Sequence, residues 1–121
     1  MNKSQAIHNF WSSFGLTAFD ENTVPTGTQM PYITYNVSLD ELDHPVSMSA
    51  SIWYRDPSWA SVTEKSIEIS DKLKNGGETI PLDEGYLWIV KGHPFMQRMN
   101  DPNDDMIRRI YINIMAEYLS H

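Results

Sequence analysis

Apolar residues recur at helical spacing near the N-terminus of the chain. Four large side chains fall at positions i, i+3, i+4 and i+7, on one face of a helix: Ile7, Phe10, Trp11 and Phe14. Asn2 or Ser4 can cap the start of this helix, because a short polar side chain accepts hydrogen bonds from its free backbone N–H groups. Gly15 suits the left-handed conformation that ends many helices. The pattern predicts an amphipathic helix that packs on a sheet.

The next two apolar patterns have the two-residue period of half-buried strands. One face of the first strand, over residues 32–39, carries Ile33, Tyr35, Val37 and Leu39. One face of the second, over residues 46–54, carries Val46, Met48, Ala50, Ile52 and Tyr54. A short extended segment over residues 16–19 and a polar loop over residues 20–29 precede the first strand. An acidic tip over residues 40–45 joins the two strands.

A second helix is predicted after Asp56, which can cap a helix that has Pro57 at its first position. Its apolar face carries Trp59, Val62, Ile69 and Leu73, with the small Ser66 among them. Lys72 and Lys74 lie in the expected last turn, where positive charge interacts favourably with the helix dipole. The run Asn75-Gly76-Gly77 ends the helix.

Three short strands are predicted after this helix, over residues 79–82, 86–91 and 95–99. Gly92-His93-Pro94 interrupts the apolar pattern, so we expect the chain to break between the last two of these strands.

The C-terminal run, residues 106–119, fits two patterns. Its isoleucines and tyrosines can form a helical stripe, and Ile110, Ile112 and Ile114 also alternate as in a strand. The density of β-branched and aromatic residues favours the strand. With this assignment, residues 1–121 form a single α+β domain, a mainly antiparallel β-sheet with two helices packed on it.

The composition is that of a folded, acidic domain. The 121 residues fit one domain, and a hydrophobic content of 40% with 12% aromatics is enough to fill a core. The absence of cysteine excludes disulfides and thiolate metal sites and suits a cytosolic setting. The chain has neither an apolar run near the roughly 20 residues that span a bilayer nor a secretory signal. The net charge of −7, with only nine Lys and Arg, disfavours direct nucleic-acid binding.

No segment carries the spacing of a known catalytic or metal-binding motif. Asp101, Asn103 and Asp105 match three ligand positions of an EF-hand, but Met106 stands where Gly is needed and Ile112 where Glu is needed. We therefore expect an ordinary turn, whose Asp and Asn side chains accept local backbone hydrogen bonds. The four histidines form no HxH or HExxH pair, and no GxSxG sequence is present. The sequence predicts no catalytic, cofactor-binding or metal-binding residues, and no enzyme.

Two features mark candidate contact surfaces. Arg108 and Arg109 form the one basic pair of the chain, and on a strand they point to opposite faces, so one of them faces solvent or a partner. Trp53 lies among serines, where it either covers a second core layer under a helix or belongs to an interface. With the polar loops, these residues form the candidate subunit or partner interface: Asp20, Glu21, Thr23, Thr26, Gln29, Asp40, Glu41, Asp43, Trp53, Arg108 and Arg109.

Three segments taken together resemble a known family. They are residues 10–35, which end in Met-Pro-Tyr-Ile-Thr-Tyr, residues 86–95, which begin with Tyr-Leu-Trp-Ile, and residues 104–119, with Arg-Arg-Ile-Tyr-Ile-Asn-Ile at their centre. Their order is similar to that in the small tail terminator and tail-completion proteins of long-tailed phages and prophages. The resemblance implies an antiparallel sheet flanked by helices, with loops and hairpins that mediate subunit contacts.

The same resemblance implies a virion structural protein that forms a ring, often a hexamer, at the head-proximal end of the tail tube. There it ends tube polymerisation and joins tail to head, so its expected partners are further copies of itself, the tail tube protein and the head–tail connector protein. We expect no cofactor and no membrane partner. The protein is expected in the host cytoplasm during assembly and then in the virion tail. We hypothesise that negative charge around such a ring lets DNA pass without specific binding.

Two other functions stay open at this point. The first is a head-completion or neck (stopper) protein of the same particle. The second is a small α+β ligand-binding or isomerase-type domain with a pocket between sheet and helices. That second function requires convergent polar residues on the core-facing side of the strands, where the pattern places apolar residues instead.

Overall fold

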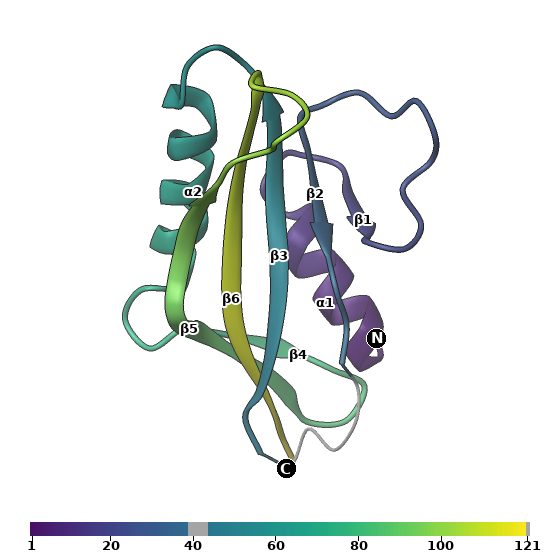
Figure 1. Ribbon diagram of the computed structural model, residues 1–121. Coiled ribbons are helices and arrows are strands. Elements are labelled where there is room, and N and C mark those ends of the chain that lie inside the picture. Colours follow the sequence, from purple (N-terminus) through teal and green to yellow (C-terminus); the bar gives the residue numbers. More distant parts are fainter. Residues whose placement is uncertain (39–43, 121) are drawn as a thin grey trace.

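The computed structural model describes residues 1–38 and 44–120. Figure 1 shows a curved sheet with two helices. The helices are α1 (Lys3–Ser12) and α2 (Ala60–Leu73). The six strands, in their order across the sheet, are β1 (Ala18–Asp20), β2 (Tyr32–Tyr35), β3 (Val46–Arg55), β6 (Ile107–Leu119), β5 (Tyr86–Met99) and β4 (Glu78–Pro81). The β1–β2 pair is parallel and the other pairs are antiparallel, so the predicted α+β class is confirmed.

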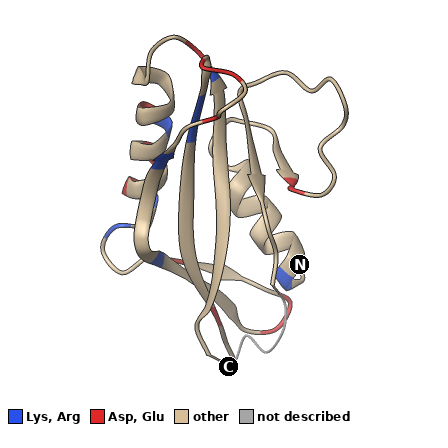
Figure 2. Cartoon of the chain, in the orientation of Figure 1, with Lys and Arg blue, Asp and Glu red and all other residues tan. Residues whose placement is uncertain are grey.

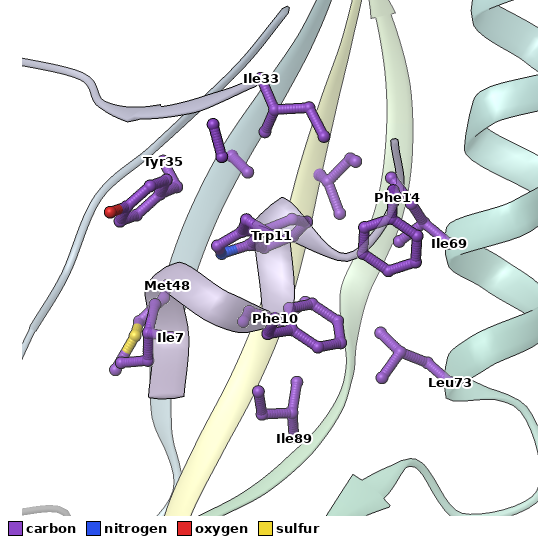
Figure 3. Close-up of a cluster of buried hydrophobic side chains, with 14 of the residues drawn as sticks. Ile7, Phe10, Trp11, Phe14, Ile33, Tyr35, Met48, Ile69, Leu73 and Ile89 are labelled. Carbon is purple, nitrogen blue, oxygen red and sulfur yellow. The ribbon is translucent and has the colours of Figure 1, made fainter. Parts of the chain in front are cut away.

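The core lies between the helices and one face of the sheet. Paired core positions on β3 and β6 include Met48 with Ile114 and Ile52 with Ile110. The buried residues of both helices belong to the same cluster, so both helices pack on this one face. In Figure 3, Trp11 lies at the centre of the cluster, and no part of its side chain is exposed. The face opposite the helices is called the open face below.

The predicted first helix is confirmed, including its cap. The Asn2 side chain accepts a hydrogen bond from the backbone N–H of Gln5, and the Gln5 side chain accepts one from the N–H of Asn2. This reciprocal capping box satisfies two N–H groups that a helix start otherwise leaves free. It fixes the direction in which α1 enters the core.

The predicted start of the second helix is wrong by three residues. The Asp56 carboxylate caps a turn, accepting the N–H of Ser58 at 2.7 Å, and α2 begins at Ala60. The Pro57 carbonyl accepts a hydrogen bond from the Arg108 side chain at 3.0 Å, so this residue is tied to β6 just before α2 begins. The predicted apolar stripe is confirmed from Val62 to Leu73, and Lys74 lies just past the helix end in an extended conformation.

The predicted break at Gly92 is a bulge inside one long strand. Lys91 pairs with Ile114 and Met96 with Ile112, so residues 92–95 of β5 all lie opposite Asn113. The Asn113 side chain donates a hydrogen bond to the Pro94 carbonyl at 2.9 Å, which anchors the extra residues. Because β6 continues unbroken, β5 resumes its pairing beyond the bulge.

The C-terminal run is a strand, as its β-branched content predicted, whereas β2 is shorter than the predicted 32–39. Beyond Tyr35, the side chain of Asn36 accepts the Ser49 N–H at 3.0 Å and donates to the Ser49 hydroxyl at 2.6 Å. The Asn36 side chain thus accepts the Ser49 N–H in place of a backbone carbonyl, and the regular pairing of β2 with β3 ends here. Residues 36–38 are described but lie outside any strand, and residue 39 of the predicted strand and residues 40–43 of the acidic tip lie outside the described residues.

Candidate interaction surface

A row of large side chains crosses the open face of the sheet. Strand pairing places Tyr32 of β2 beside Trp53 of β3, and Trp53 beside Arg109 of β6. Phe19 of β1 extends the row, its ring 5.9 Å from that of Tyr32 and edge-on to it. Tyr111 lies two residues beyond Arg109 on β6, on the same face. We call these five half-buried residues the open-face row.

Arg109 is held in the middle of this row. Its Nε donates to the Ser51 hydroxyl at 2.9 Å, and its guanidinium carbon lies 4.6 Å from the centre of the Trp53 ring and 5.8 Å from that of Tyr111. Cations over aromatic faces are attracted by the ring quadrupole. Among the described residues, no carboxylate forms an ion pair with Arg109. The guanidinium is therefore fixed in place, with its charge directed to a half-exposed surface.

The polar residues beneath the row are partners of its side chains. The indole N–H of Trp53 donates to the Thr34 hydroxyl at 2.9 Å, just as Arg109 donates to Ser51. Both hydroxyl residues are buried, Ser51 to the extent of 3% exposure. Ser49 and Ser51 share the open face with Trp53, and both are buried because larger side chains cover them. Trp53 belongs to no second core layer under a helix: it lies on the open face.

Arg108 points to the helix-covered side, as the alternation of a strand requires. It donates to the carbonyls of Pro57 at 3.0 Å and Asp105 at 2.5 Å, and its guanidinium carbon lies 5.4 Å from the centre of the Trp59 ring. Arg98 lies over the same ring at 4.7 Å. Of the predicted pair, Arg109 thus joins Trp53 in one surface, and Arg108 ties the start of α2 to the loop before β6.

The predicted polar loop projects from the edge of the sheet. Figure 1 shows the segment between β1 and β2 extending away from the rest of the molecule. Local hydrogen bonds shape it: the Asp20 side chain accepts the Asn22 N–H at 3.0 Å, and the Pro25 carbonyl accepts the N–H and hydroxyl of Thr28. The loop thus keeps its turns without support from the core. Its exposed candidate residues are Glu21, Thr23, Thr26 and Gln29.

The loop also borders a hollow on the molecule. This hollow, of about 350 Å³, is lined by Thr28, Gln29, Met30 and Arg55. The remaining candidates, Asp40, Glu41 and Asp43, lie outside the described residues.

The acidic segment before β6 is a turn, as predicted. Asp101 accepts the backbone N–H groups of Asn103 at 2.8 Å and Asp104 at 3.2 Å. The Asp104 carboxylate accepts the Met106 N–H at 2.9 Å and pairs with Arg55, and these two interactions hold the pKa of Asp104 below its usual value. No group of three or more potential metal ligands occurs within residues 1–38 and 44–120.

A row of polar side chains that joins α1 to β2 was not predicted from the sequence. The Ser12 hydroxyl lies 3.3 Å from His8 Nε2, and His8 Nδ1 lies 2.8 Å from the Tyr35 hydroxyl. Burial, with a smaller contribution from the charge of Asp20, raises the pKa of Tyr35. The tyrosine therefore stays neutral and gives no charge to stabilise a protonated histidine, as the carboxylate of a catalytic triad does.

The sequence identified two of the five residues in the open-face row, Trp53 and Arg109. Phe19, Tyr32 and Tyr111 were missed, because their alignment depends on the pairing of strands that are distant in sequence. A signal was present in Tyr32 and Trp53, large aromatics at positions where the alternation of their strands calls for polar residues.

Comparison with known proteins finds a chain of similar fold. No helix in the described part of the chain is long and apolar enough to cross a membrane. No protein-family model and no curated protein matches the sequence. The structure is similar to a chain in a solved structure described as "Virion of native gene transfer agent (GTA) particle". The TM-score is 0.62 and the identity 14%, and the match covers 98% of this chain and 95% of that chain. The two chains share a fold over nearly their whole lengths.

Proposed function

We propose that this chain is a structural subunit of a phage-like virion, of the tail terminator type. The observation that carries the proposal is the likeness, from end to end, to a chain of a gene transfer agent virion particle. Independently, the order of three sequence segments resembles that of tail terminator proteins. The subunit is not an enzyme. It ends tail tube polymerisation and joins the tail to the head.

The surface of the chain supports a role in assembly. A ring needs two different complementary surfaces on each copy, because a contact that closes by rotation is heterologous. The open-face row is one extended surface of aromatic side chains with a fixed cation. The segment from the end of β1 to the start of β2, residues 20–31, projects from the sheet edge as another, and we call it the 20–31 loop. Aromatic residues and arginine are the types enriched at interfaces. In this proposal the partners are neighbouring copies, the tail tube protein and the head–tail connector protein.

A neck or stopper role in the same particle is the second candidate, since a virion neighbour favours both roles equally. Removal of the gene from a particle-producing strain separates them. We expect tails much longer than normal by electron microscopy, with normal length restored by the wild-type gene in trans. Tails of normal length that fail to join heads support the neck role. Infectious particles with normal tails contradict both.

A further inference from the structure

We infer, on the basis of the assembly proposed above, that the 20–31 loop of one copy docks on the open-face row of a second copy, with Glu21 paired to Arg109. The partner is thus another copy of this chain, and the contact is heterologous. Three features carry this assignment: the available donors on Arg109, the charge of the loop, and the position of the loop relative to its own sheet.

Arg109 is prepared to bind a carboxylate. Of its N–H groups, Nε is engaged by the Ser51 hydroxyl, and its terminal amino groups have no acceptor among the described residues. Terminal guanidinium nitrogens bind a carboxylate through two parallel hydrogen bonds. Stacking on Trp53, which is itself hydrogen-bonded to Thr34, fixes the guanidinium before any partner arrives. Little side-chain entropy is therefore lost when a carboxylate binds.

The loop carries the complementary charge. It contains two carboxylates, Asp20 and Glu21, and no Lys or Arg. Asp20 is engaged, since its side chain accepts the Asn22 N–H. Glu21 is exposed and has no ion-pair partner among the described residues. Beyond it, the exposed Pro25 offers an apolar ring to the aromatic side chains of the row.

The loop lies where it can contact a neighbouring copy. It leaves the sheet at the β1–β2 edge and extends away from the molecule, whereas Arg109 lies on β6, two strands inward from β2. Each copy thus offers a loop on one side and a receptor on its open face. Repetition of such a contact by a constant rotation closes a ring.

Charge reversal tests the pairing. Glu21→Arg and Arg109→Glu should each weaken self-association at least about ten-fold, because close interfacial charge pairs are coupled by roughly 1.5 kcal/mol or more. The double variant, and an equimolar mixture of the two single variants, should restore it. Native mass spectrometry and light scattering, with tail tubes added as template, measure the assembly. Glu64→Arg on the outer side of α2 and Lys74→Glu beyond its end are matched controls, expected to assemble normally.

Crosslinking tests the geometry without removing the ion pair. Because the chain has no cysteine, Asn22→Cys in the loop and Tyr111→Cys in the row introduce the only thiols. Mixed copies of the two single variants, distinguished by a mass tag, should form a heterodimeric disulfide on mild oxidation. A mixture of Asn22→Cys with Lys74→Cys is the control, and it should not crosslink.

The outcomes separate this contact from the function on which it rests. Normal assembly of Arg109→Glu, or no rescue by the double variant, overturns the contact and leaves the tail-length result intact. Loss of tube binding alone in that variant, with self-association unchanged, assigns the row to the tube protein and also overturns it. A wild-type chain that remains monomeric with and without tubes contradicts both the contact and the proposed ring.

Discussion

At the residue scale, two adjacent arginines have opposite roles. Arg108 binds the Pro57 and Asp105 carbonyls on the helix-covered side and so joins two loops to the sheet. Arg109 lies on the open face, and within the described residues its side chain forms one hydrogen bond, to Ser51. Successive side chains of a strand point to opposite faces of the sheet. Two adjacent arginines can therefore have different roles, one structural and one in a candidate binding surface.

Alanine substitutions should distinguish these roles. We expect Arg108→Ala to lower the free energy of unfolding by about 2 kcal/mol, since hydrogen bonds to charged groups contribute about 1.5–3 kcal/mol. Its buried Nε has no hydrogen-bond partner in the described part of the chain, which keeps the loss of stability from being larger. Arg109→Ala should cost less than Arg108→Ala, because it removes one hydrogen bond, to Ser51, and two cation–π contacts on a half-exposed surface. Urea unfolding measures both, and equal losses would contradict the assignment.

A carboxylate in the turn before β6 makes stability depend on pH. The pKa of Asp104 is lowered by the Met106 N–H and by Arg55, so the carboxylate stabilises the fold above the unfolded pKa near 3.8. This stabilisation is lost as the pH falls through the lower folded pKa. Asp104→Asn keeps an oxygen for Met106 but loses the charge toward Arg55. The variant should be less stable than wild type at pH 7, and the difference should shrink below about pH 4 in urea titrations. A difference independent of pH would exclude the ion pair as its cause.

At the scale of elements, the molecule divides into a scaffold and an appendage. The scaffold is the sheet with α1 and α2, which share one core cluster. The 20–31 loop contributes no residue to that cluster, and its turns are closed by local hydrogen bonds. Folding energy therefore resides in the scaffold, and the loop is available for contacts outside the chain.

Replacement of residues 22–28 by a Gly-Ser segment of equal length tests this division. We expect the thermal unfolding midpoint to change by only a few degrees, since apolar burial supplies most of the stability. Assembly on tail tubes should be lost. Circular dichroism and electron microscopy measure the two effects separately, and a variant that loses its fold would show that the loop belongs to the scaffold.

At the scale of the whole molecule, the arginines and several acidic residues lie at the same end of the sheet. All four arginines lie toward the end of the sheet next to the turn at residues 101–105, as the pairing of Arg55 with Ile107 and Arg98 with Ile110 requires. Figure 2 shows acidic residues at the same end, and Asp104 pairs there with Arg55. Among the described residues, Arg55 is therefore partly neutralised by Asp104, and the four arginines lie close to acidic residues instead of forming a wholly basic face for phosphate binding.

A subunit of this kind should not hold DNA. With a net charge of −7, we expect a dissociation constant for duplex DNA weaker than about 100 µM at physiological salt, beyond the usual range of non-specific binders. Fluorescence anisotropy with a labelled duplex measures it. Micromolar binding that weakens steeply with salt would contradict the proposal that DNA passes such a ring without being bound.

The sequence by itself determined the local elements. The stripe in α1, the alternation in β3 and the β-branched density of β6 are periodicities of the chain, and each was confirmed because local geometry places side chains at fixed spacing. Tertiary contacts decided the boundaries. The residues before α2 form a turn that is bound to Arg108 of β6, and the Asn36 side chain bonds Ser49 where β2 ends. An unbroken β6 lets β5 resume its pairing beyond the bulge.

The candidate site, too, was determined in part by the sequence and in part by the tertiary structure. Arg109 and its orientation away from Arg108 follow from strand alternation alone, and so does the position of Trp53 among serines. That these two lie side by side, with Phe19, Tyr32 and Tyr111 in one row, was decided by the register of four strands. Register depends on which side chains share the core, and this is a property of the folded chain that no single segment carries.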